Sequence, residues 1–210
     1  VLEYLKDKDF IVTAVKKSVR KKQPAPPFTT STLQQEASRR LSFNARRTMK
    51  AAQELYEGIE IEGRGAVGLI TYMRTDSLRV SEEAQKAAAD MIRERFGEEY
   101  LPAKPRVYKA KGNAQDAHEA IRPSTIDILP EEVKSSLSSD QYKLYKLIWE
   151  RTVASQMTPA VYEQTTLTIS ADAYELKATG SVLVFDGHLR LADKKDMNEE
   201  KLVAVPLIAS

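Results

Sequence analysis

The chain has 210 residues, of which 42% are hydrophobic and 30% are charged, and its net charge is +2 at pH 7. This composition is typical of a globular protein that buries a core, and it does not by itself indicate a nucleic-acid partner. The absence of cysteine excludes disulfides and thiolate metal sites, and two histidines, His118 and His188, are too few for the usual histidine-based zinc site.

The sequence carries no sign of attachment to a membrane. None of its apolar runs reaches the roughly 20 residues that cross a bilayer, and no signal peptide opens it. It starts at Val1 and stops within an apolar run at 202–208. We therefore expect a piece of a longer protein that has no membrane partner.

The first part of the chain predicts one strand and two helices. Residues 10–19 alternate in polarity and are rich in β-branched side chains, which favours a strand. Ser31 and Gln34 have the spacing of a capping box before an apolar repeat of four, so a helix is expected over 31–42. Asn44 is suited to cap a second helix that follows directly.

These two helices resemble a helix-turn-helix pair, a motif that often contacts DNA. Three basic side chains of the second helix could bind phosphates, namely Arg46, Arg47 and Lys50. A solvated basic face on a helical hairpin that only packs explains the same residues.

The middle of the chain continues mainly helical. A loop with two glycines is expected over 60–66, leading into a further strand, and Ser81 is suited to cap a helix. Two more helices are expected over 114–121 and 139–157. The second of these carries an aromatic stripe, which favours core packing over base stacking.

The character of the sequence changes after Pro159. Short alternating runs predict strands at 161–169, 174–178, 182–185 and 188–191, and Asp186 followed by glycine signals a hairpin. Because β-type sequence brackets a helical middle, we predict an α+β fold. A mainly helical domain, 25–158, is expected to be inserted into a discontinuous antiparallel β domain, 1–24 and 159–210.

The segment GLITYMRTDS at residues 68–77 carries the most chemical information. In an extended chain, residues i and i+2 project to the same side, so Tyr72 and Arg74 would present a phenol and a guanidinium together. Only about one tyrosine side chain in a thousand is ionised at neutral pH, and attack on a phosphodiester therefore needs charge stabilisation nearby. Arg74 is suited to that task. The same Tyr-x-Arg pattern also occurs at an ordinary half-exposed strand edge that has no catalytic role.

This segment resembles the active-site segment of type IA DNA topoisomerases, in particular the bacterial topoisomerase I branch. Three further stretches resemble the same family in the same order. They are PPFTTSTLQQEAS at 26–38, AHEAIRP at 117–123, and LIW with QMTPA at 147–149 and 156–160. Four ordered motifs between about 24 and 191 are far more specific than one.

The resemblance implies roles for particular residues. Tyr72 would be the nucleophile and Arg74 would stabilise the charged phosphate, both as catalytic residues. His118 would contact the DNA backbone, and Thr71 is a further candidate for phosphate contact, with packing as the alternative. The resemblance also implies that the β segments form an arch that carries the tyrosine domain.

The reaction implied by the resemblance is the relaxation of negatively supercoiled DNA. Tyr72 would attack single-stranded DNA to give a 5′-phosphotyrosyl bond, and rejoining would need no ATP. In this family Mg²⁺ is bound by an acidic cluster in another domain, and no such cluster occurs in this sequence. We therefore expect no metal site here, the remaining domains of the enzyme as partners, a cytoplasmic and nucleoid-associated location, and no relaxation by the chain alone.

Two other functions fit parts of the sequence. A non-catalytic module could bind duplex DNA through the helical pair and two clusters of lysine and arginine, one within 16–22 and one within 39–50. Such a module would be indifferent to Tyr72→Phe. A structural arm or protein-interaction fragment would have no affinity for nucleic acid. Neither alternative accounts for four motifs in topoisomerase order.

Overall fold

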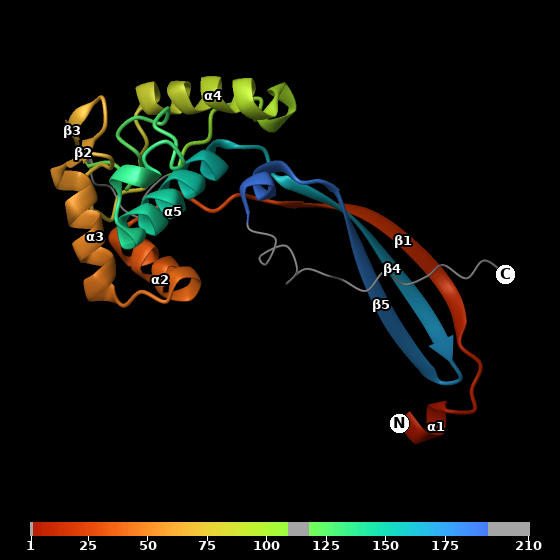
Figure 1. Ribbon diagram of the computed structural model, residues 1–210. Coiled ribbons are helices and arrows are strands. Elements are labelled where there is room, and N and C mark those ends of the chain that lie inside the picture. Colours follow the sequence, from red (N-terminus) through yellow and green to blue (C-terminus); the bar gives the residue numbers. More distant parts are fainter. Residues whose placement is uncertain (1, 109–117, 193–210) are drawn as a thin grey trace. The chain divides into compact units, whose positions relative to one another are not determined.

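The computed structural model describes residues 2–108 and 118–192, and the chain divides into two compact units. One unit combines residues 1–23 with 159–210, and the other comprises 24–158. Antiparallel strands dominate the described part of the first unit and helices dominate the second (Figure 1). The predicted α+β fold is therefore confirmed.

The β unit is an antiparallel sheet in which β4 lies between β1 and β5 (Figure 1). In chain order its described elements are α1 (Leu2–Leu5), β1 (Ile11–Lys22), β4 (Ala160–Ala171), β5 (Tyr174–Phe185) and a 3-10 helix at Gly187–Leu191. The register pairs Val15 with Leu167 and Lys22 with Ala160. Strands from the two ends of the chain thus form one sheet.

The end of this sheet corrects three predictions. The runs at 174–178 and 182–185 are one strand, β5, because Gly180 between them stays paired with Thr165. The hairpin turn lies at Asp172, whose φ of 54° is left-handed and whose carboxylate is held by Tyr4 and Lys8. The predicted hairpin at Asp186 and strand at 188–191 are wrong, since a 3-10 helix begins at Gly187.

The helical unit is built around α5 (Ser139–Gln156), which packs against α2, α3 and α4 (Figure 1). Its other described elements are α2 (Thr30–Leu41), α3 (Ala45–Glu57), the short strands β2 (Ile59–Ile61) and β3 (Gly65–Val67), α4 (Glu82–Phe96), and 3-10 helices at Glu98–Tyr100 and Lys134–Ser136. None of the helices in the described residues is both long and apolar enough to span a membrane.

Local capping signals placed the helices well. Asn44 caps α3 by accepting a hydrogen bond from the backbone of Arg47 at 2.8 Å, and Ser81 caps α4, as predicted. The start of α2 differs from the prediction. Its capping box is formed by Thr29 and Thr32 instead of Ser31 and Gln34, because a threonine hydroxyl at the third helical position supplies the returning contact.

The aromatic stripe of α5 lies in the core, as predicted. Tyr145 and Trp149 are buried, and their polar atoms donate to the carbonyl oxygens of Ile128 at 2.7 Å and Ile126 at 2.8 Å. Burial of an aromatic ring is favourable when its polar atom keeps a partner. These two contacts fix the segment that follows residue 123 against α5.

Three further predictions for the helical unit were wrong. The expected loop at 60–66 is a hairpin of β2 and β3, and the segment through Tyr72 is irregular apart from an isolated bridge between Ile70 and Pro123. Half of the expected helix at 114–121, residues 114–117, lies outside the described residues. Its end is extended, since Ile121 pairs with Phe28 in an isolated bridge.

Candidate active site

The segment before Tyr72 is anchored by buried side chains and by backbone hydrogen bonds. Leu69 and Ile70 are buried in the core, and the amide of Leu69 donates to the carbonyl of Leu55 in α3 at 2.7 Å. A Cβ on Gly68 would lie only 2.8 Å from the carbonyl oxygen of Tyr56. Glycine is therefore required for this segment to pass so close to the end of α3.

Thr71 connects the same segment to the extended stretch after His118. Its amide donates to the carbonyl of Arg122 at 2.9 Å, and its hydroxyl donates to the carbonyl of Ala120 at 2.8 Å. The hydroxyl also accepts from the amide of Arg122 at 3.0 Å. The Thr71 side chain is thus fully engaged with backbone groups.

Thr30, the first residue of α2, holds the other side of Tyr72. Its hydroxyl lies 2.7 Å from the carbonyl oxygen of Met73, and it accepts from the amide of Thr75 at 2.9 Å. Sequence reasoning missed this residue. It lies within the FTTSTLQQ stretch, whose sequence indicates a helix start and a resemblance to the family but no contact with the Tyr72 segment.

Tyr72 and Arg74 are both exposed, and the buried Met73 lies between them. Tyr72 is 45% exposed. Among the described residues, neither the Tyr72 hydroxyl nor the Arg74 guanidinium has a hydrogen bond or ion pair. Although the predicted strand is absent, the alternation leaves a phenol and a guanidinium two residues apart and open to solvent on a fixed backbone.

Tyr56 is a neighbour of the candidate nucleophile that sequence reasoning did not identify. Its ring lies edge-on to the ring of Tyr72, with centroids 5.4 Å apart and an angle of 66° between the planes. Tyr56 is itself 42% exposed at the end of α3. No local pattern in the sequence connects these two rings.

The stretch that begins at His118 is fixed by a carboxylate between two guanidinium groups. Glu119 lies 2.6 Å from Arg122 and 3.7 Å from Arg79, measured between side-chain oxygen and nitrogen atoms. Burial opposes the charge of Glu119, but the hydrogen bond from Arg122 and the charges of both arginines lower its pKa. His118 is exposed, and its carbonyl oxygen accepts from Arg79 at 3.4 Å.

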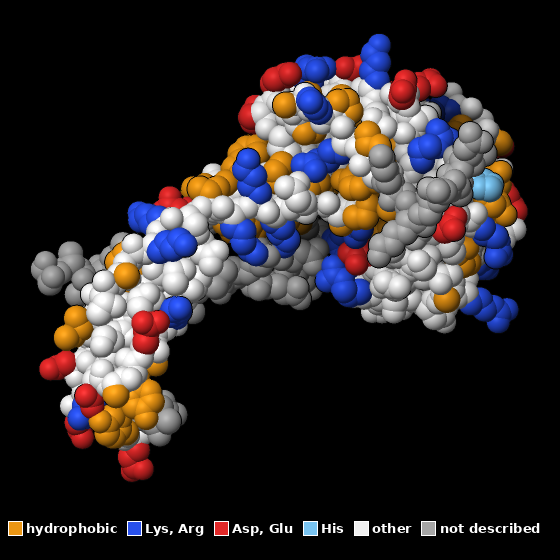
Figure 2. All heavy atoms as spheres, turned by 180° about the vertical axis from the view of Figure 1, so that it is seen from behind, with side chains coloured by type: hydrophobic (Ala, Val, Ile, Leu, Met, Phe, Trp, Pro, Cys, Tyr) orange, Lys and Arg blue, Asp and Glu red, His pale blue; other side chains and the backbone are white. Residues whose placement is uncertain are grey.

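The three basic candidates of α3 lie away from this segment, toward the helix start. Arg47 forms a two-pronged ion pair with Asp140, with distances of 2.6 and 2.7 Å, and it stacks on Phe43. Lys50 and Arg46 are both exposed; Lys50 lies 4.0 Å from Glu54, whereas Arg46 has no ion pair among the described residues. On the face in Figure 2, lysine and arginine side chains alternate with acidic ones over the helical unit.

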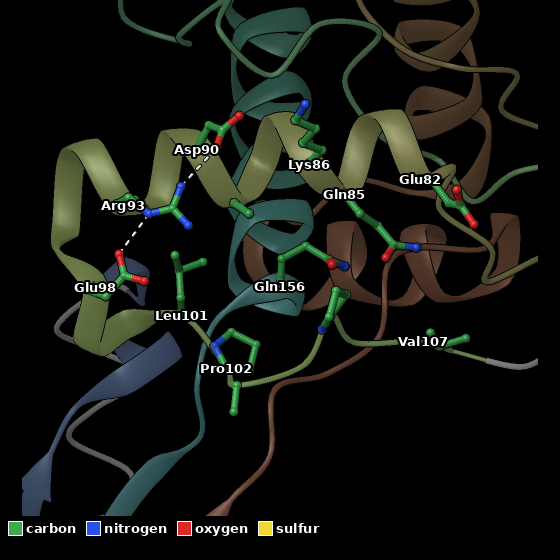
Figure 3. A pocket seen from close by; sticks show the side chains of 13 residues that line it. Glu82, Gln85, Lys86, Asp90, Arg93, Glu98, Leu101, Pro102, Val107 and Gln156 are labelled. Carbon is green, nitrogen blue, oxygen red and sulfur yellow. Dashed lines mark hydrogen bonds and ion pairs between the residues drawn. The ribbon is translucent and has the colours of Figure 1, made fainter.

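A cleft of about 1010 Å³ lies beside α4 (Figure 3). Along its helical wall, Arg93 bridges Asp90 and Glu98, and Leu101 and Pro102 face it from the following segment (Figure 3). None of its lining residues belongs to the Tyr72 segment. The candidate site is therefore an open surface and not this cleft.

The described residues contain no group of three or more histidine, aspartate or glutamate side chains placed to hold a metal ion. Glu119, the acidic side chain nearest to His118 in the sequence, is already occupied by two arginines. The donor set required by a hard cation such as Mg²⁺ is thus not provided by this part of the chain.

Comparison with known proteins identifies the family. The family model described as DNA topoisomerase matches residues 1–209. The chain belongs to the DNA topoisomerase family. The family predicted from four ordered motifs is therefore confirmed.

Two individual topoisomerases show how closely the chain resembles its relatives. It is 44% identical to DNA topoisomerase 1 of Rickettsia bellii over 211 residues, which cover 98% of this chain and 26% of that protein. The structure of full-length topoisomerase I from Thermotoga maritima matches with a TM-score of 0.78 and 44% identity, over 90% of this chain and 30% of that one. The chain thus spans about a quarter to a third of the length of these topoisomerases.

Proposed function

We propose that this chain supplies the nucleophile of a type IA topoisomerase, and that Tyr72 is that nucleophile. The observation that carries the proposal is the pair of exposed side chains, Tyr72 and Arg74, on a segment held by hydrogen bonds on both sides. A nucleophile must be accessible to a polymer substrate and yet held in a fixed position.

In the proposed reaction, the phenolic oxygen of Tyr72 attacks the phosphorus of a phosphodiester in single-stranded DNA. The bond from phosphorus to the 3′-oxygen breaks, that oxygen leaves as a 3′-hydroxyl, and a 5′-phosphotyrosyl bond forms. Arg74 stabilises the negative charge on the non-bridging oxygens because its planar guanidinium presents several N–H donors in a fixed plane. His118, exposed at the start of the neighbouring stretch, contacts the DNA backbone.

Rejoining is the reverse of this reaction. The 3′-hydroxyl attacks the phosphotyrosine, so the energy of the broken bond is retained and no ATP is needed. If another strand passes through the gap before rejoining, negatively supercoiled DNA relaxes. Underwound duplex favours the reaction because it supplies the single strand.

The chain alone is not expected to relax DNA. We propose that Mg²⁺ is bound by parts of the enzyme outside this chain, because the described residues do not fit a metal site. Thr71 is proposed to position the backbone next to Tyr72 and not to contact DNA, since its hydroxyl already donates to Ala120 and accepts from Arg122.

A non-catalytic DNA-binding module remains the alternative. It would rely on the helical pair and on both basic clusters, but within α3 Arg47 is paired with Asp140 and Lys50 lies near Glu54. These pairs reduce the positive charge that the helix offers to phosphates. The alternative also gives no reason for an exposed tyrosine beside an exposed arginine.

The deciding experiment detects a covalent adduct. The chain is incubated with a labelled single-stranded oligonucleotide and Mg²⁺, with and without a separately purified polypeptide that comprises the remaining domains. Denaturing gels then separate adduct from free DNA, and Tyr72→Phe is the matched control because it removes only the hydroxyl.

An adduct that requires the added domains and is absent from Tyr72→Phe is the expected result. An adduct that persists in Tyr72→Phe would overturn the assignment of the nucleophile. An adduct from the chain alone would contradict the proposal that the site is completed elsewhere. Binding of DNA without an adduct in any mixture would favour the binding-module alternative.

A further inference from the structure

Thr30 contacts both peptide groups that flank Arg74. Its hydroxyl donates to the carbonyl of Met73 at 2.7 Å, with the carbonyl of Thr75 also within 3.1 Å, and it accepts from the amide of Thr75 at 2.9 Å. The amide of Thr30 donates to the carbonyl of Thr75 at 2.9 Å. The Met73 carbonyl belongs to the peptide group before Arg74, and the Thr75 amide belongs to the one after it. Together these contacts set both backbone dihedral angles of Arg74.

The segment has no regular structure that could do the same. Residues 71–80 belong to neither a helix nor a strand, so no ladder of backbone hydrogen bonds fixes the direction of Arg74. The Arg74 side chain has no hydrogen bond or ion pair within the described residues. Its direction therefore depends on its own backbone, which Thr30 holds.

The Thr30 hydroxyl is not needed to start α2. The N-cap of that helix is Thr29, whose side chain accepts from the amide of Thr32, and the side chain of Thr32 accepts from the amide of Thr29 in return. Different threonines thus cap the helix and hold the backbone of Arg74. Loss of the Thr30 hydroxyl can disturb the backbone of Arg74 while the cap of α2 stays in place.

We propose that Thr30 is a positioning residue that aligns the Arg74 guanidinium with the phosphate attacked by Tyr72. This inference rests on the proposed function of Tyr72 and Arg74. A guanidinium stabilises a transition state through donors in a fixed plane, so its contribution is sensitive to orientation. A misplacement of about 1 Å can cost roughly a hundredfold in rate.

The test uses the full-length topoisomerase that contains this chain. Thr30→Val removes the hydroxyl with little change of shape, Thr30→Ser keeps the hydroxyl, and Thr30→Ala is a second variant without it. Thr152→Val is the matched control, because it removes a buried threonine hydroxyl that only donates to Ile148 within α5 at 2.9 Å. Single-turnover adduct formation, single-strand affinity and thermal unfolding are measured for each.

We expect cleavage to slow about tenfold or more in Thr30→Val and Thr30→Ala, and to stay within about threefold in Thr30→Ser and Thr152→Val. Single-strand affinity should remain unchanged. When Arg74→Ala is already present, Thr30→Val should cost less than about twofold more, because the two residues act as a unit. A purely structural role of Thr30 would not produce this non-additivity.

Two failures can be told apart. Adduct formation by Tyr72→Phe would overturn the proposal that Tyr72 is the nucleophile. Two other results, obtained with Tyr72→Phe inactive, would overturn the role of Thr30 and leave that of Tyr72 in place. In the first, Thr30→Val and Thr30→Ala cleave DNA at the normal rate. In the second, these variants slow cleavage by the same factor whether Arg74 is present or replaced by alanine. If a variant has an unchanged midpoint temperature of thermal unfolding, loss of folded protein is excluded as the cause of its slower cleavage.

Discussion

The rings of Tyr56 and Tyr72 meet edge to face, with centroids 5.4 Å apart, although 16 positions separate them in the chain. Gly68 makes this approach possible, since any side chain there would meet the carbonyl of Tyr56. The candidate nucleophile therefore packs against the last turn of α3, and α3 contributes to the site through an aromatic ring.

Replacing Tyr56 should slow DNA cleavage through loss of this ring. An aromatic pair contributes about 0.5–1.5 kcal/mol beyond its buried area, which corresponds to roughly two- to tenfold in rate if the contact orients Tyr72. Tyr56→Ala should therefore form adduct about two to ten times more slowly in single-turnover assays. Tyr56→Phe keeps the ring and should stay within about twofold. Equal losses in the two variants would show that the hydroxyl matters and not the ring.

Gly68→Ala should impair both folding and cleavage. The new methyl group would lie 2.8 Å from the carbonyl oxygen of Tyr56. Because that oxygen belongs to the backbone, the clash is relieved only if one of the two chain segments moves. Overpacking of this kind costs about 1–3 kcal/mol. Urea unfolding and adduct formation measure the two effects. Gly63→Asn is the control, because no atom lies within 4 Å of a Cβ there and asparagine tolerates its φ of +76°.

The sequence was sufficient for features that depend on neighbouring residues. The caps of α3 and α4 at Asn44 and Ser81 were predicted because a cap and its helix are adjacent in the chain. The hairpin predicted at Asp186 was wrong because that prediction also used only adjacent residues, whereas the position of a turn depends on distant contacts. The actual turn at Asp172 is held by Tyr4 and Lys8, which lie far away in the sequence and leave no local pattern.

The same distinction applies to the candidate site. Tyr72 and Arg74 were identified because they lie two residues apart within one motif. Thr30 and Tyr56 were missed as site residues, because contacts across 43 residues or between a helix end and a loop exist only once the chain has folded. Thr71 was identified, but its hydroxyl partners, Ala120 and Arg122, could not be read from sequence.

The ion-paired Glu119 should make stability depend on acid pH. Its pKa is lowered from the ordinary value of 4.5, so its contribution is complete above that value and is lost as pH falls through the lower value in the folded protein. Glu119→Gln should lower the free energy of unfolding by about 1 kcal/mol at pH 7, measured by urea titration. The difference from the unmodified chain should shrink as pH falls below 4.5 and disappear only below the lower pKa of the folded protein. Glu60→Gln, at an exposed position, should show no such dependence. A difference that stays constant with pH would contradict this account.

Arg46 and Arg47 should respond differently to replacement although they are adjacent. Arg46 is exposed and has no ion pair among the described residues, so it is free to bind a phosphate. Arg46→Ala should weaken single-strand binding and reduce the slope of log affinity against log salt concentration by about 0.7, as expected for one lost phosphate contact.

Arg47→Ala should instead act on stability, because Arg47 is paired with Asp140 at 2.6 Å and stacks on Phe43. Its ion pair is exposed to solvent, so we expect only a small loss of stability in urea unfolding, with an unchanged salt slope. The comparison tests whether α3 meets DNA at all. If Arg46→Ala leaves the slope unchanged, Arg46 belongs to a solvated face and does not contact DNA, and the phosphate contacts lie elsewhere in the protein.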